Sequence, residues 1–390
     1  MLKVRVALSC VAALLLGVAG AHAEGTIKIG IIAPYSGQFA DTGVQMDNGI
    51  KLFMQQHGDK VAGKQIEIIR KDVGGIAPDV AKRLAQELIV RDKVDLLTGF
   101  ILTPNAMAAG DVSAQAKKFM VVMNAATSVI IDKSPYMVRT SVTTPQINET
   151  YGAWVFKHGT KKVYTMVSDY GPGHDAEQAF HRGFKAAGGE IVGADRFPVA
   201  NPDFSAFVQR AKNANPEAIY VWLPGGTQPA AIAKALAERG INPTNTKIFG
   251  QGELTLPEAL KSMGDAAIGM ITAFHYDYNH QSALNKTFVA GFEKMFNRIP
   301  DIYSVGAYDG MHVIYAALEK TKGNTDAEAL VGAAKGMAWE SPRGPISIDP
   351  ETRDIVQTIY IRKVEKVDGK LVNVEFDKVE KVKDPTHGKK

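Results

Sequence analysis

The stretch that decides the fold is TIKIGIIA at residues 26–33, which runs into PYSG at residues 34–37 and then into a helical pattern. The first eight residues are rich in apolar and β-branched side chains, and Pro34 ends the run, as is typical of a strand. Beyond the polar loop, apolar residues between 46 and 54 recur at i, i+4, i+7 and i+8, one face of a helix. The sequence therefore predicts a strand, a loop and a helix in that order.

The same alternation of strand and helix repeats along the chain. In a first series, strands are predicted at 65–70, 94–99 and 119–124 and helices at 78–91 and 106–118. A second series begins after Thr143-Thr144-Pro145, with strands at 162–168, 190–197, 218–223 and 247–250 and helices at 147–158, 173–187, 204–214 and 228–239. Strands separated by helices of this length form parallel βαβ units. The sequence thus predicts an α/β protein with two doubly wound lobes.

The C-terminal part departs from this pattern. Helices predicted at 284–296 and 303–320 are followed by a short strand at 346–348 and a long alternating tract at 356–382. Asp368-Gly369 inside the tract predicts the turn of an antiparallel hairpin. Because the last helices bring no new series of strands, we expect them to complete the first lobe. The expected division is 24–143 with 276–350 for lobe 1, 144–275 with 351–383 for lobe 2, and a polar, disordered tail at 384–390.

The N-terminus has the features of a signal peptide. Lys3 and Arg5 precede an apolar run at 6–19, and Ala21-His22-Ala23 has the small-x-small pattern of a cleavage site, so we expect cleavage after Ala23. The run is shorter than the about 20 apolar residues of a membrane span, and no other segment approaches one. Cys10, the only cysteine, lies inside the run rather than after it, which disfavours a lipid anchor. We expect an exported, cysteine-free protein with no direct membrane insertion.

Composition narrows the class further. Hydrophobic residues make up 45% and charged residues 22% of the chain, as in ordinary globular proteins, and the length suggests two domains with substantial cores. The formal net charge of +4 falls when the signal peptide is removed, which argues against a nucleic-acid partner.

Two loops after predicted strands carry hydroxyl groups suited to an anion. In open α/β sheets ligands bind beyond the carboxyl ends of the strands. Residues 99–105 follow the third strand and residues 124–128 the fourth, and they contain Thr103 and Thr127. Both hydroxyls could donate to a carboxylate beside the free N–H groups of a helix N-terminus. A role as simple helix caps is equally compatible with the pattern.

A set of ordered landmarks resembles one known family. They are residues 29–37 with Gly43, then 99–103, 124–127, Asp169-Tyr170-Gly171 and Tyr308-Asp309-Gly310. Together they cover essentially the whole mature chain and resemble the branched-chain-amino-acid type of periplasmic binding protein, which delivers ligands to ABC importers. The resemblance implies two lobes joined by three crossovers, a ligand in the cleft between them, a location in the periplasm and a membrane permease as partner. It also implies that Thr103, Ala125 and Thr127 hold the ligand carboxylate and that Tyr170 closes over it from the second lobe.

One departure from the family pattern bears on the ligand. Members that bind amino acids place an acid after the last parallel strand of the second lobe, where it pairs with the ligand ammonium. Our placement puts Gly252 at that position and Glu253 one residue beyond. A buried ammonium without a partner would cost several kcal/mol, comparable with the roughly 8 kcal/mol of a micromolar complex. If Glu253 points away from the cleft, an amino acid is disfavoured.

Aromatic residues near the same loops suggest a flat ligand. Phe39, Phe100, Tyr170, Trp222, Phe274, Tyr276 and Tyr308 are candidates for the cleft, and about half of such a set would serve core packing instead. We therefore predict a small aromatic or other apolar carboxylate without an amine. The residues expected to contact it are Phe39, Thr42, Phe100, Leu102, Thr103, Ala125, Ala126, Thr127, Tyr170, Trp222, Gly226, Thr227, Gly252, Glu253, Phe274, Tyr276 and Asp309.

Other signals are weaker. Residues 171–176 match the G-x-G-x-x-A dinucleotide fingerprint, but in the second unit and in a compartment poor in such cofactors. His275, Asp277 and His280 resemble a metal set, but alternate residues of a strand point to opposite faces. No nucleophile and base can be paired by spacing. We expect a monomeric binding protein with no enzymatic activity, cofactor or metal; the alternatives are a branched-chain amino acid binding protein, an exported α/β enzyme, and a soluble receptor that docks onto a sensor.

Overall fold

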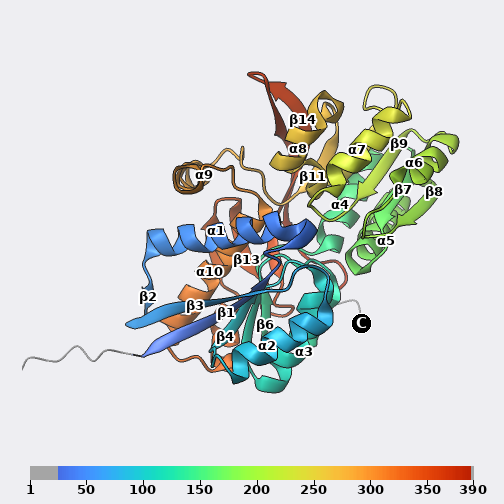
Figure 1. The fold of residues 1–390 in the computed structure, drawn as a ribbon. Helices are drawn as coiled ribbons and strands as arrows, with labels where there is room; N and C mark the ends of the chain where they lie inside the picture. Colours follow the sequence, from blue (N-terminus) through green and yellow to red (C-terminus); the bar gives the residue numbers. More distant parts are fainter. Residues whose placement is uncertain (1–24, 388–390) are drawn as a thin grey trace, which may run out of the picture.

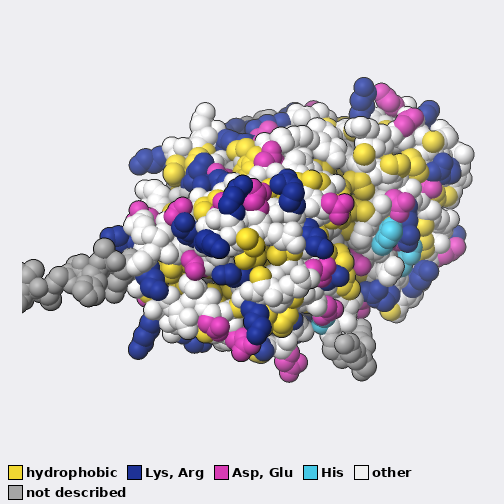
Figure 2. Space-filling view, turned by 60° about the horizontal axis from the view of Figure 1, so that its bottom comes forward, with side chains coloured by type: hydrophobic (Ala, Val, Ile, Leu, Met, Phe, Trp, Pro, Cys, Tyr) yellow, Lys and Arg dark blue, Asp and Glu magenta, His cyan; other side chains and the backbone are white. Residues whose placement is uncertain are grey.

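The computed structural model describes residues 25–387, which form two α/β lobes (Figure 1). The predicted signal peptide at 1–23 lies outside the described residues. Within 25–387, no helix combines the length and the apolar character that a membrane crossing requires. Figure 2 shows basic and acidic side chains interspersed over one face of the molecule.

The first lobe is built on a six-stranded sheet. Its strand order is β2-β3-β1-β4-β5-β6, and all neighbours are parallel except β2 and β3. The strands are β1 (Thr26–Ala33), β2 (Lys60–Val61), β3 (Lys64–Asp72), β4 (Leu96–Gly99), β5 (Phe119–Val122) and β6 (Met137–Arg139). The helices are α1 (Ala40–His57), α2 (Pro78–Val90), α3 (Thr103–Ala116), α9 (Ala283–Phe296), α10 (Ile302–Lys320) and α11 (Ala327–Ala334), with 3-10 turns η1 (Gly37–Phe39) and η2 (Ser128–Lys133).

Strand β1 explains why helices cover both faces of this sheet. Ile27, Ile29 and Ile31 join the core cluster that contains α1 and α10, whereas Ile32 packs with side chains of α2 and α3. Alternate residues of a strand face opposite sides, so an apolar run without polar alternation is buried on both faces. Strand β1 at 26–33 therefore lies inside the sheet and is covered by helices on both faces (Figure 1).

The second lobe contains a larger mixed sheet. Its order is β12-β13-β14-β11-β10-β9-β7-β8, with β15 paired to β14. The strands are β7 (Lys162–Ser168), β8 (Glu190–Phe197), β9 (Ala218–Trp222), β10 (Lys247–Gln251), β11 (Ile271–Phe274), β12 (Ala338–Ser341), β13 (Gly344–Ile348), β14 (Ile355–Val367) and β15 (Lys370–Val382). The helices are α4 (Thr144–Lys157), α5 (Gly171–Ala186), α6 (Phe204–Asn213), α7 (Gln228–Glu238) and α8 (Pro257–Met263), with η3 (Gly252–Thr255) and η4 (Gly264–Ala267).

The chain passes between the lobes three times, which confirms the predicted fold class. It crosses after β6, again after β11, and a third time between α11 and the strands β12 to β14. The predicted hairpin is also present, with Asp368 and Gly369 at φ of 49° and 76° between β14 and β15. Strands β12 and β13 differ from the expected division, because β13 pairs with β14 and so joins them to the sheet of lobe 2.

The C-terminal tail is not solvated as expected. Lys383 Nζ lies 2.7 Å from Asp349 Oδ2, and Asp384 is 7% exposed and accepts a hydrogen bond from the Ser128 hydroxyl. His387 follows, with its Nδ1 3.4 Å from Asp354 Oδ2. The expectation of disorder is therefore wrong for residues 384–387, because a polar segment can be fixed by a few specific polar partners.

Candidate functional site: the cleft between the lobes

A small cavity lies between the lobes, beyond the carboxyl ends of strands from both sheets. Its volume is about 30 Å³, which is room for about two water molecules. An organic ligand therefore enters only if the lobes part. Its lining consists of Phe39, Ile101, Leu102, Thr103, Asn124, Ala126, Tyr170, Pro172, Trp222, Pro224, Gly225, Glu253 and Tyr303.

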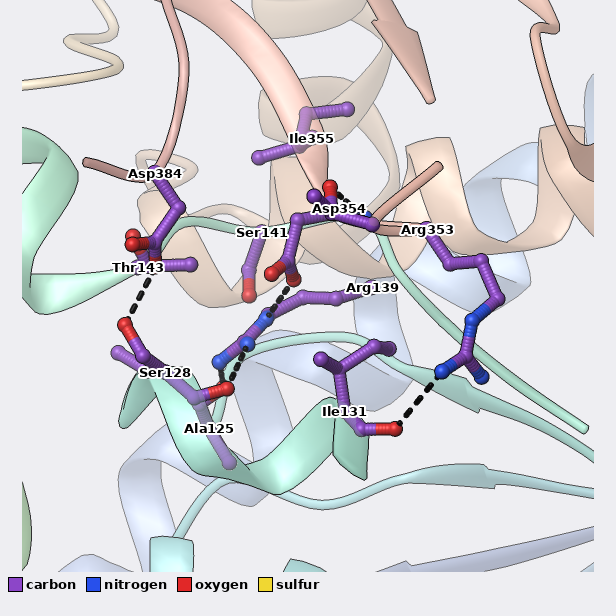
Figure 3. Close-up of polar contacts among 12 residues, drawn as sticks. Ala125, Ser128, Ile131, Arg139, Ser141, Thr143, Arg353, Asp354, Ile355 and Asp384 are labelled. Carbon is purple, nitrogen blue, oxygen red and sulfur yellow. Dashed lines mark hydrogen bonds and ion pairs between the residues drawn. The ribbon is translucent and has the colours of Figure 1, made fainter. Parts of the chain in front are cut away.

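The loop at 124–128 is held so that its acceptors turn away from the cleft. Arg139 Nη1 donates to the carbonyls of Ala125 and Thr127 at 3.0 and 2.8 Å, and its Nη2 donates to the carbonyl of Ser128 at 3.1 Å (Figure 3). The Ala126 carbonyl accepts from Thr144 N at 2.8 Å. The N–H groups of Ala125 and Ser128 donate to the Phe100 carbonyl and to Asp175 Oδ2. With four successive carbonyls also engaged elsewhere, the loop can offer the cleft the N–H groups of residues 126 and 127, as an anionic ligand requires.

Thr103 and Thr127 bring two hydroxyls together beside this loop. Their Oγ1 atoms are 3.1 Å apart, and both residues are 4% exposed. Thr103 opens α3 and Gly171 opens α5, and neither helix has a side-chain hydrogen bond at its N-cap. The free N–H groups and the positive end of each helix dipole add to the attraction for an anion. The arrangement is suited to a carboxylate.

Aromatic side chains form the rest of the wall. Phe39 comes from η1 of lobe 1, and the rings of Tyr170 and Trp222 lie 5.7 Å apart in lobe 2. Tyr303, near the start of α10, completes the set. Burial raises the pKa of Tyr170 and Tyr303, and the nearby Glu253 contributes to the rise, so both phenols stay neutral. Flat apolar faces of this kind suit a flat apolar ligand.

Glu253 lies in the cavity lining and Gly252 does not. A Cβ at Gly252 would lie 2.0 Å from the Phe274 ring and 2.5 Å from Arg362 Nη2, so position 252 cannot carry an acidic side chain without rearrangement. Glu253 Oε1 accepts from Gln251 Nε2 at 3.0 Å. Burial raises the pKa of Glu253 to about 7. The only acidic side chain of the lining therefore sits where burial disfavours its charged form.

Several residues expected in the cleft lie elsewhere. Phe100 packs in the core under α2 and α3, Phe274 lies over Arg362, and Ala125 is held behind the lining by Arg139. Tyr276 donates its hydroxyl to Asn285, and Asp309 pairs with Arg343 at 2.9 Å. Tyr308 donates to Gln56 between α10 and α1. Apart from Ala125, these residues are aromatic or acidic, but the sequence does not show which face of their element is buried.

Thr127 and three further candidates lie beside the cavity rather than in its lining. Thr42, Gly226 and Thr227 line a neighbouring hollow of about 320 Å³, which shares Tyr303 with the cavity. The Thr42 hydroxyl donates to the Phe39 carbonyl at 2.6 Å. This hollow is lined by residues of both lobes.

Six lining residues were absent from the expected contacts. They are Ile101, Asn124, Pro172, Pro224, Gly225 and Tyr303. The sequence could have indicated Asn124, because it begins the loop at 124–128 that carries Ala125 and Thr127. Its Nδ2 donates to the Ile101 carbonyl at 3.0 Å. No sequence pattern indicated Tyr303, because it lies on α10, which is far in sequence from the other residues of the lining.

The rival signals have structural explanations. A Cβ at Gly173 would lie 1.9 Å from the Ser168 carbonyl oxygen, so the tight turn from strand to helix requires glycine at position 173. Asp277 pairs with Arg362 and His280 with Glu375, so the two do not converge on one point. Among the described residues, Asp354, Asp384 and His387 have the spacing of metal ligands, but Arg139 already pairs with Asp354. A hollow of about 910 Å³ against β12 to β15 lies away from the strand ends that form the cleft.

Comparison with known proteins identifies the family. Residues 26–370 match the periplasmic binding protein family. The chain is 44% identical over 384 residues to "Leu/Ile/Val-binding protein homolog 6" of Brucella melitensis biotype 1, with 98% of each chain covered. This protein belongs to the periplasmic binding protein family.

Two solved structures are also similar. A solute-binding protein of an ABC transporter from Rhodopseudomonas palustris BisB5, in complex with 3,4-dihydroxybenzoic acid, is 53% identical with a TM-score of 0.89, and 92% of this chain and 99% of that chain are covered. A solute-binding protein of an ABC transporter from Rhodopseudomonas palustris HaA2, in complex with p-hydroxybenzoic acid, is 42% identical with a TM-score of 0.91, covering 94% and 100%.

Proposed function

We propose that this protein is the periplasmic solute-binding subunit of an ABC importer and that it carries a small aromatic carboxylate between its lobes. The observation that carries the proposal is the loop at 124–128, whose carbonyls are engaged by Arg139 and Thr144 beside the paired hydroxyls of Thr103 and Thr127. The proposal is supported by the two solved relatives, which were in complex with hydroxylated benzoic acids.

In this proposal the ligand carboxylate binds lobe 1 first. It accepts hydrogen bonds from the hydroxyls of Thr103 and Thr127 and from the backbone N–H groups of residues 126 and 127. Leu102 and Phe39 contact the apolar ring of the ligand. Closure then brings Tyr170 and Trp222 over the ring and excludes water. The closed form docks onto the membrane permease as a monomer. In this proposal the ligand is bound and released without turnover.

A branched-chain amino acid is the second candidate. Glu253 lines the cavity, so an acid able to pair with an ammonium is present after all, one residue beyond the position we assigned to it. The absence of an acidic partner for a ligand ammonium can therefore no longer be used as an argument against an amino acid. What favours an aromatic acid is the wall formed by Phe39, Tyr170, Trp222 and Tyr303.

Isothermal titration calorimetry on the mature protein separates the candidates. We expect heat and micromolar or tighter affinity with benzoate-type acids and little or none with leucine or valine. Tight binding of leucine with no heat from any aromatic acid would contradict the proposal. Mass spectrometry of ligand released from the freshly purified protein gives an independent readout.

A further inference from the structure

Two residues of the cavity lining each carry a buried polar atom that has no hydrogen-bond partner among the described residues. The atoms are Trp222 Nε1 and Glu253 Oε2, on side chains whose residues are 3% and 8% exposed. Trp222 ends β9, and Glu253 follows β10, which pairs with β9 in parallel. A buried donor or acceptor left without a partner is unfavourable. One is a donor and the other an acceptor, and both belong to neighbouring strand ends of lobe 2.

A chain of hydrogen bonds fixes the role of Glu253. The Tyr220 hydroxyl donates to Asn148 Oδ1 at 2.5 Å, and Asn148 Nδ2 donates to Gln251 Oε1 at 2.5 Å. Gln251 Nε2 in turn donates to Glu253 Oε1 at 3.0 Å. Because each of these hydrogen bonds fixes which group donates in the next, Glu253 accepts through Oε1. Its other oxygen, Oε2, remains for a ligand.

We propose that Trp222 and Glu253 form a subsite for a hydroxyl group on the ring of the ligand, so that the protein selects hydroxylated benzoates over benzoate itself. This inference rests on the proposed function. A phenolic hydroxyl donates and accepts at once, so it satisfies Glu253 Oε2 and the Trp222 N–H together. An ammonium has only donors and would leave the indole N–H without a partner.

The two ends of the ligand are then read by different lobes. The carboxylate contacts Thr103 and Thr127 of lobe 1, and the hydroxyl contacts Trp222 and Glu253 of lobe 2. A benzoate without the hydroxyl still binds lobe 1 but leaves two buried groups unsatisfied on closure. Selectivity therefore arises in the closed state, in which the cavity is smallest.

Calorimetry with matched ligands tests the subsite. The ligands are 3- and 4-hydroxybenzoate, benzoate, and 4-methylbenzoate, in which a methyl group of similar size replaces the hydroxyl. The variants are Glu253→Ala, Glu253→Gln and Trp222→Phe, with Glu258→Gln as control, because Glu258 lies on α8 and bonds Lys261 at the surface.

We expect the wild type and E258Q to bind at least one hydroxybenzoate about 10- to 100-fold more tightly than benzoate or 4-methylbenzoate. E253A and W222F should reduce this ratio below about threefold while the benzoate affinity changes little, which also shows that the variants fold. In E253Q the one amide oxygen accepts from Gln251 Nε2, so an NH2 donor faces the ring hydroxyl and most of the preference should be lost.

Equal affinity of the wild type for benzoate and both hydroxybenzoates would overturn the subsite, and so would a preference that survives in E253A and W222F. A failure of the proposed function looks different: no aromatic acid binds to the wild type, whereas leucine or valine does. In that case the subsite is refuted together with the function.

Discussion

Arg139 and Asp354 join the two halves of the hinge through a buried ion pair, with Arg139 Nε 2.7 Å from Asp354 Oδ1 and both side chains at most 1% exposed. Arg139 ends β6 of lobe 1, and Asp354 directly precedes β14 (Figure 3). The same guanidinium holds the ligand loop through three carbonyls. The position of the loop at 124–128 therefore depends on Arg139, which is itself held by the hinge residue Asp354.

Two substitutions separate these roles. Asp354→Asn leaves the buried guanidinium without its counterion, so we expect it to lower the free energy of unfolding by about 3 kcal/mol, with a smaller effect on ligand affinity. Arg139→Met should lower both, because the carbonyls of residues 125–128 lose their donor. Urea titration and calorimetry measure the two quantities. Equal losses of affinity in the two variants would show that the loop does not depend on the Arg139 hydrogen bonds.

The hydroxyl pair gives a second prediction. Thr127→Val removes one charge-assisted hydrogen bond to the ligand carboxylate and should weaken binding by about 1 to 3 kcal/mol. Thr42→Val is the control, because the Thr42 hydroxyl donates to the Phe39 carbonyl and faces the neighbouring hollow. Its effect on affinity should be below about 1 kcal/mol. Unchanged affinity in T127V would remove Thr127 from the site.

The sequence predicts the scaffold well because the scaffold depends on repeated patterns. The strands at 26–33, 162–168 and 190–197 have the predicted bounds. The first two are mainly apolar or β-branched runs, and the third is bounded by Gly188-Gly189 and Pro198. Short strands without such a run, including β6 at 137–139 and β11 at 271–274, were not predicted as elements of the two series, and neither was α8. The pairing of β13 with β14 depends on contacts between distant segments, which periodicity does not record.

The site is only partly predictable, because one residue of register decides which side chain enters the cleft. The 3-10 turn after β10 places Gly252 against Phe274 and turns Glu253 to the cavity. Tyr303 reaches the cleft only because α10 returns to lobe 1. The hydroxyl residues Thr103 and Thr127 were found because strand ends converge in any parallel sheet.

Gly226 gives a third prediction, about closure. It has φ of 83°, and a Cβ there would lie 2.9 Å from the Gln38 carbonyl oxygen of lobe 1. Gly226→Ala should therefore oppose closure and weaken ligand binding. Gly240→Ala is a matched control, since Gly240 has φ of 71° with no neighbour within 4 Å. Both variants carry backbone strain of about 1 kcal/mol, but only G226A should lower affinity in calorimetry. Equal affinities of G226A and G240A would show that the close contact between position 226 and the Gln38 carbonyl does not limit closure.

Glu253 also makes stability depend on pH. Burial raises its pKa from 4.5 to about 7, while Arg362 acts in the opposite direction. The other groups that face Glu253 are Tyr170, Tyr220 and Tyr303, whose own pKa values are raised by burial, so they do not titrate near neutrality. Asp301 has a pKa raised by burial to about 7 as well, so the wild-type profile alone cannot isolate Glu253.

The contribution of Glu253 to this pH dependence is isolated by comparing the wild type with Glu253→Gln. Between pH 4.5 and 7 the folded protein holds a proton on Glu253 that the unfolded chain has released, so the free energy of unfolding falls as pH rises through this interval. The loss amounts to about 3 kcal/mol for a shift of this size, and it is absent in E253Q. The stability of wild type relative to E253Q, measured by urea titration without ligand, should therefore decrease from pH 5 to pH 8. A pH-independent difference would show that Glu253 has an ordinary pKa and is not desolvated in the closed cleft.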